Sequence, residues 1–102
     1  MGRFKNESTQ NPIVDWLLQQ DYKYDRGASG EKGYIKVYPV SDDFYYVWVT
    51  ISLKDKKIYI YKEYSCGGCV GEDEIIIEDE WLNDLSIFID NVDEKLEFWI
   101  GE

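Results

Sequence analysis

Two runs of alternating hydrophobic and polar residues, Phe44–Leu53 and Ile58–Tyr64, stand near the centre of the chain. A period of two is typical of β-strands with one buried face. The runs flank Lys54-Asp55-Lys56-Lys57 and predict a β-hairpin in which residue 54 pairs with residue 57. Leu53 then faces Ile58, Ile51 faces Ile60, and Thr50 faces Tyr61. The aliphatic side chains of both strands share one face of the sheet in this register.

A third strand is predicted over Tyr34–Val40, with Ile35 and Val37 directed toward the core. Pro39 cannot donate a hydrogen bond to a neighbouring strand, which indicates a position at the sheet edge. Ser41-Asp42-Asp43 has the composition of a turn into the central hairpin. A three-residue turn sets Val37 against Val47 and Ile35 against Val49.

A helix is predicted to begin at Asn11-Pro12, because asparagine is a good N-cap and proline suits the first helical position. Residues 1–10 are polar and are expected to form a flexible tail. From residue 81 the hydrophobic period becomes helical, and Asp79 is the expected N-cap. The apolar positions of this segment fall on one arc: Trp81, Leu82, Leu85, Phe88, Ile89, Val92, Leu96, Trp99 and Ile100.

Three points of this outline stay open. Ile75–Ile77 can form a fourth strand or an apolar plug in the core, Lys95–Ile100 can end the helix or form a short closing strand, and the helix can break near Asn91-Val92-Asp93.

The predicted fold is a single α+β domain over residues 11–102. It has an N-terminal helix, a three-stranded antiparallel sheet with a short optional fourth strand, and a C-terminal amphipathic helix, with both helices on the aliphatic sheet face. Double-stranded-RNA-binding domains have the same element order, but their loops and second helix are basic, whereas this final segment is acidic.

The net charge of the 102 residues is −10. Such a charge argues against direct binding to nucleic acid or to an anionic membrane, and it favours a basic partner. The first residues have no apolar core typical of a signal peptide, and the longest apolar run, Phe44–Val49, is too short to span a membrane. A cytoplasmic location is therefore expected.

The charge is concentrated at one end of the chain. Residues 1–71 contain ten Lys or Arg and nine Asp or Glu, whereas residues 72–102 contain twelve acids and only Lys95. Acids opposite the apolar arc, with two apolar side chains among them, form the predicted partner-binding surface: Glu80, Asp84, Ile87, Asp90, Asp93, Glu94, Glu97 and Phe98. The alternative is an ordinary solvated helix face. Against it, like charges at i,i+4 weaken a helix, which favours a docking role.

The sheet face opposite the aliphatic one is predicted to be aromatic, and it is the alternative partner-binding surface: Tyr34, Tyr38, Tyr46, Trp48, Tyr59 and Tyr61. Exposed tyrosine is common at protein interfaces. Ordinary cross-strand packing and cover by a helix are the competing interpretations.

Cys66-Gly67-Gly68-Cys69 has the spacing of a metal knuckle. A closed zinc site takes four ligands, whereas the chain has no second cysteine pair and no histidine. We therefore expect a glycine turn with reduced thiols and no cofactor, although a shared metal site or a disulfide stays open.

Enzyme chemistry is not expected, because the usual Ser or Cys nucleophile needs a base such as His. The leading hypothesis is a small non-catalytic inhibitor that mimics nucleic acid toward a basic nucleic-acid-binding protein or nuclease. In size and charge the chain is similar in kind to anti-CRISPR and anti-restriction proteins of phages and to immunity proteins against nuclease toxins. The alternative is a protein-interaction or oligomerisation module that uses the tyrosine-rich sheet face.

Overall fold

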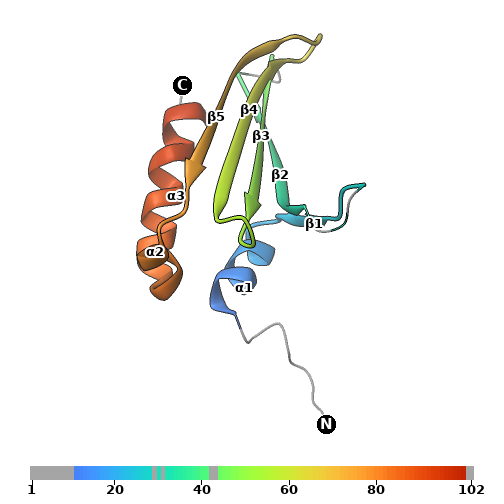
Figure 1. The fold of residues 1–102 in the computed structure, drawn as a ribbon. Coiled ribbons are helices and arrows are strands. Elements are labelled where there is room, and N and C mark those ends of the chain that lie inside the picture. Colours follow the sequence, from blue (N-terminus) through green and yellow to red (C-terminus); the bar gives the residue numbers. More distant parts are fainter. Residues whose placement is uncertain (1–10, 29, 31, 42–43, 101–102) are drawn as a thin grey trace.

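A meander of antiparallel strands, in which each strand pairs with the next along the chain, forms the centre of the fold (Figure 1). The computed structural model describes residues 11–28, 30, 32–41 and 44–100, so the predicted flexible tail lies outside the described residues. The described elements are α1 (Pro12–Gln19), β1 (Lys23–Asp25), β2 (Gly33–Val40), β3 (Tyr45–Ser52), β4 (Lys57–Tyr64), β5 (Cys69–Ile76), α2 (Asp79–Asn83) and α3 (Leu85–Ile100). The α+β class is confirmed, but the sheet has five strands in place of three or four.

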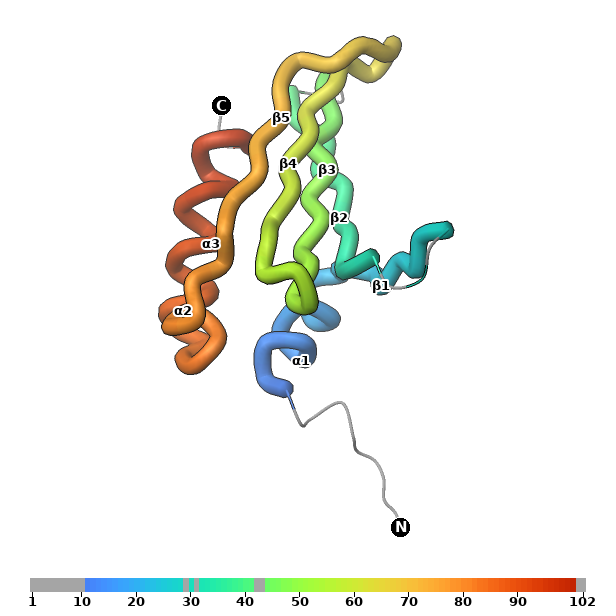
Figure 2. Tube along the Cα trace, viewed as in Figure 1, coloured from blue at the N-terminus to red at the C-terminus, as the bar shows by residue number. Residues whose placement is uncertain are grey.

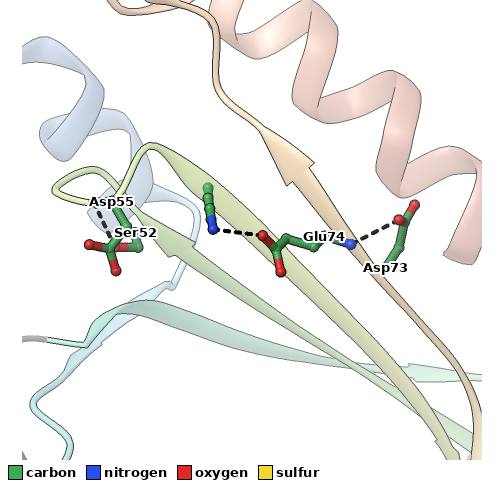
Figure 3. Close-up of polar contacts among 5 residues, drawn as sticks. Ser52, Asp55, Asp73 and Glu74 are labelled. Atoms are coloured by element: carbon green, nitrogen blue, oxygen red, sulfur yellow. Dashed lines mark hydrogen bonds and ion pairs between the residues drawn. The ribbon is translucent and has the colours of Figure 1, made fainter.

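The central hairpin of β3 and β4 forms with a register two residues away from the predicted one. Ile51 pairs with Ile58 and Ser52 pairs with Lys57, which leaves a four-residue connection. The hydroxyl of Ser52 accepts a hydrogen bond from the amide of Asp55 at 3.2 Å and closes this turn (Figure 3). Because the shift is even, the predicted faces of both strands are retained.

The predicted assignment of the β2 side chains to the two faces of the sheet is wrong. Val40 pairs with Tyr45, so the connection to β3 is one residue longer than expected; Asp42 and Asp43 of the predicted turn lie outside the described residues. A change of one residue turns every side chain of a strand to the other face. Ile35 and Val37 therefore lie on the face away from the helices.

Two strands at the sheet edges extend the predicted sheet. The β1 strand pairs with Gly33–Ile35, and among the described residues no strand pairs with Pro39 on that side, so its missing amide is tolerated. The β5 strand runs along the whole of β4 and contains the acidic residues 72–74. The fourth-strand interpretation of Ile75–Ile77 is thus confirmed for its first two residues, in a much longer strand.

Helices lie near both ends of the described part of the chain. Asn11 caps α1 as predicted, its Oδ1 accepting hydrogen bonds from the amides of Ile13 and Val14. The C-terminal helix is broken at Asp84, which has extended backbone, and not near Asn91-Val92-Asp93. Its N-cap is Glu78, one residue before the predicted Asp79. Residues 95–100 are helical, so the closing-strand alternative is wrong.

The helices cover one face of the sheet, with α3 beside β5 and α1 near the β3–β4 turn (Figures 1 and 2). The rings of Trp16 and Phe88 join α1 to α3 in an edge contact at 6.1 Å. The buried hydrophobic residues are Ile13, Leu17, Tyr22, Val40, Val47, Val49, Ile51, Ile58, Ile60, Ile77, Trp81, Phe88 and Val92. The helix-covered face is therefore the aliphatic face predicted for β3 and β4.

Polar side chains of β2 reach this covered face and find partners there. The hydroxyl of Tyr38 donates a hydrogen bond to the hydroxyl of buried Tyr22 at 3.2 Å. The Lys36 ammonium donates to the carbonyl of Gln20 at 2.5 Å and lies 4.8 Å from the centre of the Tyr38 ring. These contacts let a strand with polar inward side chains pack below the helices.

Candidate binding surfaces

Four acids form a stripe on the exposed side of α3. Asp90, Asp93, Glu94 and Glu97, here called the acidic stripe, are all exposed. Their spacing of three and four residues places them within about 100° of arc along one side of a helix. They span about 10.5 Å of the helix axis, or one charge per about 3.5 Å. One strand of DNA carries one charge per about 3.4 Å, so the linear charge densities are similar.

Two acids of the predicted surface lie outside this stripe. Glu80 is exposed on α2, before the break in the helix. Asp84 lies at the break, where its Oδ1 accepts a hydrogen bond from the amide of Ser86 at 2.9 Å. An aspartate in this position caps the first turn of the following helix. Asp84 therefore has a structural role, and its charge lies at the start of α3 and not in the stripe.

The two predicted apolar anchors differ in their exposure. Ile87 is half-buried and packs against the core, which corrects the expectation that it faces water. Phe98 is 77% exposed, and its ring contacts Trp99 edge-on at 5.7 Å. Phe98 is thus the one predicted anchor that a partner can reach.

Acids of β5 extend the acidic surface beyond the helix. Asp73 lies opposite Ile60, so it points to the same side of the sheet as α3, as Figure 3 shows. It lines a groove with Glu94, Lys95, Glu97 and Phe98, in which three of the four charged side chains are acidic. The sequence alone does not single out Asp73, because residues 72–74 read as an acidic run outside the predicted strands. The alternation of Asp73 with Ile75 is the sequence signal that could have placed both residues on one face of a strand.

Ion pairs neutralise only some acids of the C-terminal region. Lys57 bonds Glu74 at 2.8 Å, and Lys56 bonds Asp79 at 2.7 Å. Hydrogen bonding and charge from Glu74 raise the pKa of Lys57. No member of the acidic stripe forms an ion pair with another residue in the described part of the chain. The stripe therefore keeps its charge available to a partner.

Basic residues gather at the other edge of the sheet. Arg26, Lys32 and Lys54 line a depression beside β1, and β1 and β5 are the two outermost strands. The molecule thus has an acidic edge and a mixed, more basic edge. A field of this kind orients a charged partner during its approach.

The second candidate surface is the sheet face away from the helices, here called the open sheet face. Four of the six predicted aromatic residues lie on it, namely Tyr46, Trp48, Tyr59 and Tyr61. Tyr34 and Tyr38 do not, because the orientation of β2 places them on the helix-covered face, packed against the core. Trp48 is 41% exposed and Val37 is 38% exposed, so no element of the described chain buries the centre of this face.

The cysteine pair lies at the turn between β4 and β5. Cys66 and Cys69 are both free and exposed, and Gly67 and Gly68 have φ values of 105° and 100°, which suit glycine. Within the described ranges, no three His, Cys, Asp or Glu side chains are placed to hold one metal ion. The structure thus brings the two thiols into one turn without adding further ligands.

No protein-family model, curated protein or solved structure matches this chain. None of the helices in the described residues combines the length and the apolar character needed to cross a bilayer. The surfaces described above are therefore the basis for a functional proposal.

Proposed function

We propose that this protein is a non-catalytic inhibitor that presents the acidic stripe of α3, together with Asp73 of β5, to a basic nucleic-acid-binding protein or nuclease. The observation that carries the proposal is the row of four exposed carboxylates that form no ion pair with other described residues and whose charge density along the helix axis is similar to that of one DNA strand along the duplex axis. A groove that binds phosphates through Lys and Arg side chains would accept these carboxylates in the same way.

Phe98 adds an apolar contact beside the stripe. A ring that is 77% exposed at the edge of an acidic groove can enter a pocket of the partner and anchor the complex. Charge then supplies rapid association and orientation, and the ring slows dissociation. Exclusion of DNA or RNA from the partner's groove is the inhibitory step, and it requires no reaction.

The proposal is tested by affinity capture from the source cells, followed by elution with duplex DNA. Wild-type protein should capture a basic protein that DNA displaces. The variant Asp90→Asn/Glu94→Gln/Glu97→Gln should lose most of that capture, because three of the four stripe charges are removed. Asp84 is left unchanged, since it caps α3.

A matched control removes three acids at a distance from the stripe. Asp21→Asn/Asp25→Asn/Asp55→Asn has the same net charge as the stripe variant, but its substitutions lie around β1 and the β3–β4 turn. This control should capture the partner as wild type does. Equal loss in both variants would show that net charge, and not the stripe, drives binding. Capture that DNA does not displace would contradict nucleic-acid mimicry.

The exposed aromatic residues of the open sheet face favour a second candidate function, a protein-interaction or oligomerisation module. Stripe variants would then bind normally, and variants of Trp48 or Tyr59 would fail.

A further inference from the structure

The open sheet face carries a row of side chains whose chemistry changes from one end to the other. Val37, Trp48, Tyr61 and Glu72 lie directly opposite one another on β2, β3, β4 and β5. Neighbouring strands are about 4.8 Å apart, so the row extends over about 14 Å. It is aliphatic at one end, aromatic in the middle and anionic at the other end.

A second row of side chains beside it also ends in a carboxylate. Ile35, Thr50, Tyr59 and Glu74 are opposed across the same four strands. Here the carboxylate already binds a cation, since the Lys57 ammonium lies 2.8 Å from Glu74 (Figure 3). In the first row Glu72 forms no ion pair with any other described residue. A shallow depression lined by Tyr59, Tyr61, Glu72 and Glu74 joins the two carboxylates.

The indole of Trp48 is held in place by a contact within the sheet. The indole nitrogen of Trp48 donates a hydrogen bond to Glu63 Oε2 at 2.9 Å. Partial burial, with contributions from Cys69, Glu63 and Glu72, raises the pKa of the Tyr61 phenol, so its ring stays neutral. A ring fixed before binding loses little conformational entropy when a ligand covers it.

We propose that this row binds an extended basic segment of a partner protein, with an arginine guanidinium stacked on Tyr61 and paired with Glu72. A planar guanidinium suits both contacts, because it stacks on aromatic rings and donates two parallel hydrogen bonds to a carboxylate. An apolar side chain two residues away in the segment lies on the same side of an extended chain, about 7 Å from the arginine. That distance brings it over Trp48 and Val37.

The charge of the open sheet face indicates which kind of partner binds there. A second copy of this chain would bring a net charge of −10 and the same acids to the face, whereas a basic segment is complementary to Glu72 and Glu63. The row lies on the opposite side of the sheet from α3, so this binding surface does not depend on the proposed inhibitory function.

The test is a titration of the ¹⁵N-labelled full chain with the peptide acetyl-Gly-Leu-Ser-Arg-Gly-amide, followed by NMR. The indole N–H signal of Trp48 and the amides of Tyr61 and Glu72 should shift with peptide concentration. A peptide with citrulline in place of arginine has nearly the same shape without the charge, and it should bind at least about tenfold more weakly. Equal binding of the two peptides would overturn the proposal.

Matched variants locate the site. Glu72→Gln should abolish the shifts, whereas Glu97→Gln, which removes one exposed acid from α3, should leave them unchanged. Tyr61→Leu keeps an apolar side chain but loses the aromatic ring and should weaken binding, and Tyr61→Phe should not. Shifts confined to α3, or no shifts with millimolar peptide, would overturn this proposal and leave the capture experiment on the acidic stripe unaffected.

Discussion

Gly33 lies so close to Ile51 that a Cβ atom built on the glycine would be 2.7 Å from the Ile51 carbonyl oxygen. The glycine also has a φ of 143°, which L side chains rarely adopt. It is the first residue of β2, so the close approach brings the start of this strand against the end of β3. Glycine is therefore required at this position for two reasons, the close contact with the Ile51 carbonyl and the positive φ.

Gly33→Ala should destabilise the fold by about 2–4 kcal/mol, because backbone on both sides has to shift. Urea denaturation measures the loss. Gly30→Ala is a matched control: its φ is also positive, at 114°, but its added Cβ meets no atom within 4 Å. The control should lose only about 1–2 kcal/mol from backbone strain. Equal losses would show that conformation alone, and not the contact with Ile51, requires glycine.

Alkaline pH should unfold the protein through Tyr22. Burial of the phenol raises the pKa of Tyr22 far above its ordinary value. The folded state therefore holds this proton more tightly than the unfolded chain does. The stabilisation is complete below pH about 10, the ordinary tyrosine pKa, and above it stability falls by up to about 1.4 kcal/mol per pH unit.

Tyr22→Phe removes the titrating group and should flatten this alkaline decline. Near pH 7 the variant should be about 1 kcal/mol less stable, because Tyr38 loses its acceptor. The exposed Tyr59→Phe is the control and should keep the wild-type slope. Urea unfolding curves between pH 7 and pH 11 give both quantities, and an unchanged slope in Tyr22→Phe would contradict the assignment.

The cap at the start of α3 should depend on a side-chain oxygen and not on charge. Asp84→Ala should cost about 1 kcal/mol, since the amide of Ser86 loses its acceptor. Asp84→Asn keeps an oxygen in the same place and should cost a few tenths of that amount. Similar losses in both variants, measured by thermal unfolding, would indicate an electrostatic contribution in place of a cap.

The acidic stripe should weaken the fold slightly. Asp93 and Glu97 are like charges four residues apart, in the half of α3 nearer its negative C-terminal end. Asp93→Asn/Glu97→Gln should raise the free energy of unfolding by about 0.5 kcal/mol at low salt. The gain should disappear in 1 M NaCl, where screening acts within about 3 Å. A loss of stability would show that these acids support the fold.

The two thiols should be dispensable for folding. Cys66 and Cys69 are exposed, so Cys66→Ser/Cys69→Ser should change stability by no more than about 0.5 kcal/mol. Thermal unfolding tests this, together with zinc analysis of the purified wild-type protein. Stoichiometric zinc that is lost together with a dimer in the variant would instead indicate a site shared between two chains.

Local patterns in the sequence were enough to determine several parts of this structure. Asn11-Pro12 marks the start of α1 because capping involves only neighbouring residues. The alternation in β3 and β4 identifies their buried face, since the pleat sets which side chains of a strand point together. An error of two residues in the register did not change that face. The position of Phe98 opposite the apolar arc likewise predicts its exposure.

Relationships between elements were decided only by the tertiary structure. One additional residue before Tyr45 exchanged the two faces of β2. Tyr34 and Tyr38 therefore pack against the core, and Val37 is exposed. Ile87, predicted among the acids, packs against the core instead. Pairing of β5 with β4 brought Asp73 beside the acidic stripe and aligned Glu72 with Tyr61. Sequence periodicity is a property of one segment, whereas turn lengths and strand pairing decide which residues of different segments become neighbours. Both candidate surfaces consist of residues from different segments, so only the tertiary structure defines them.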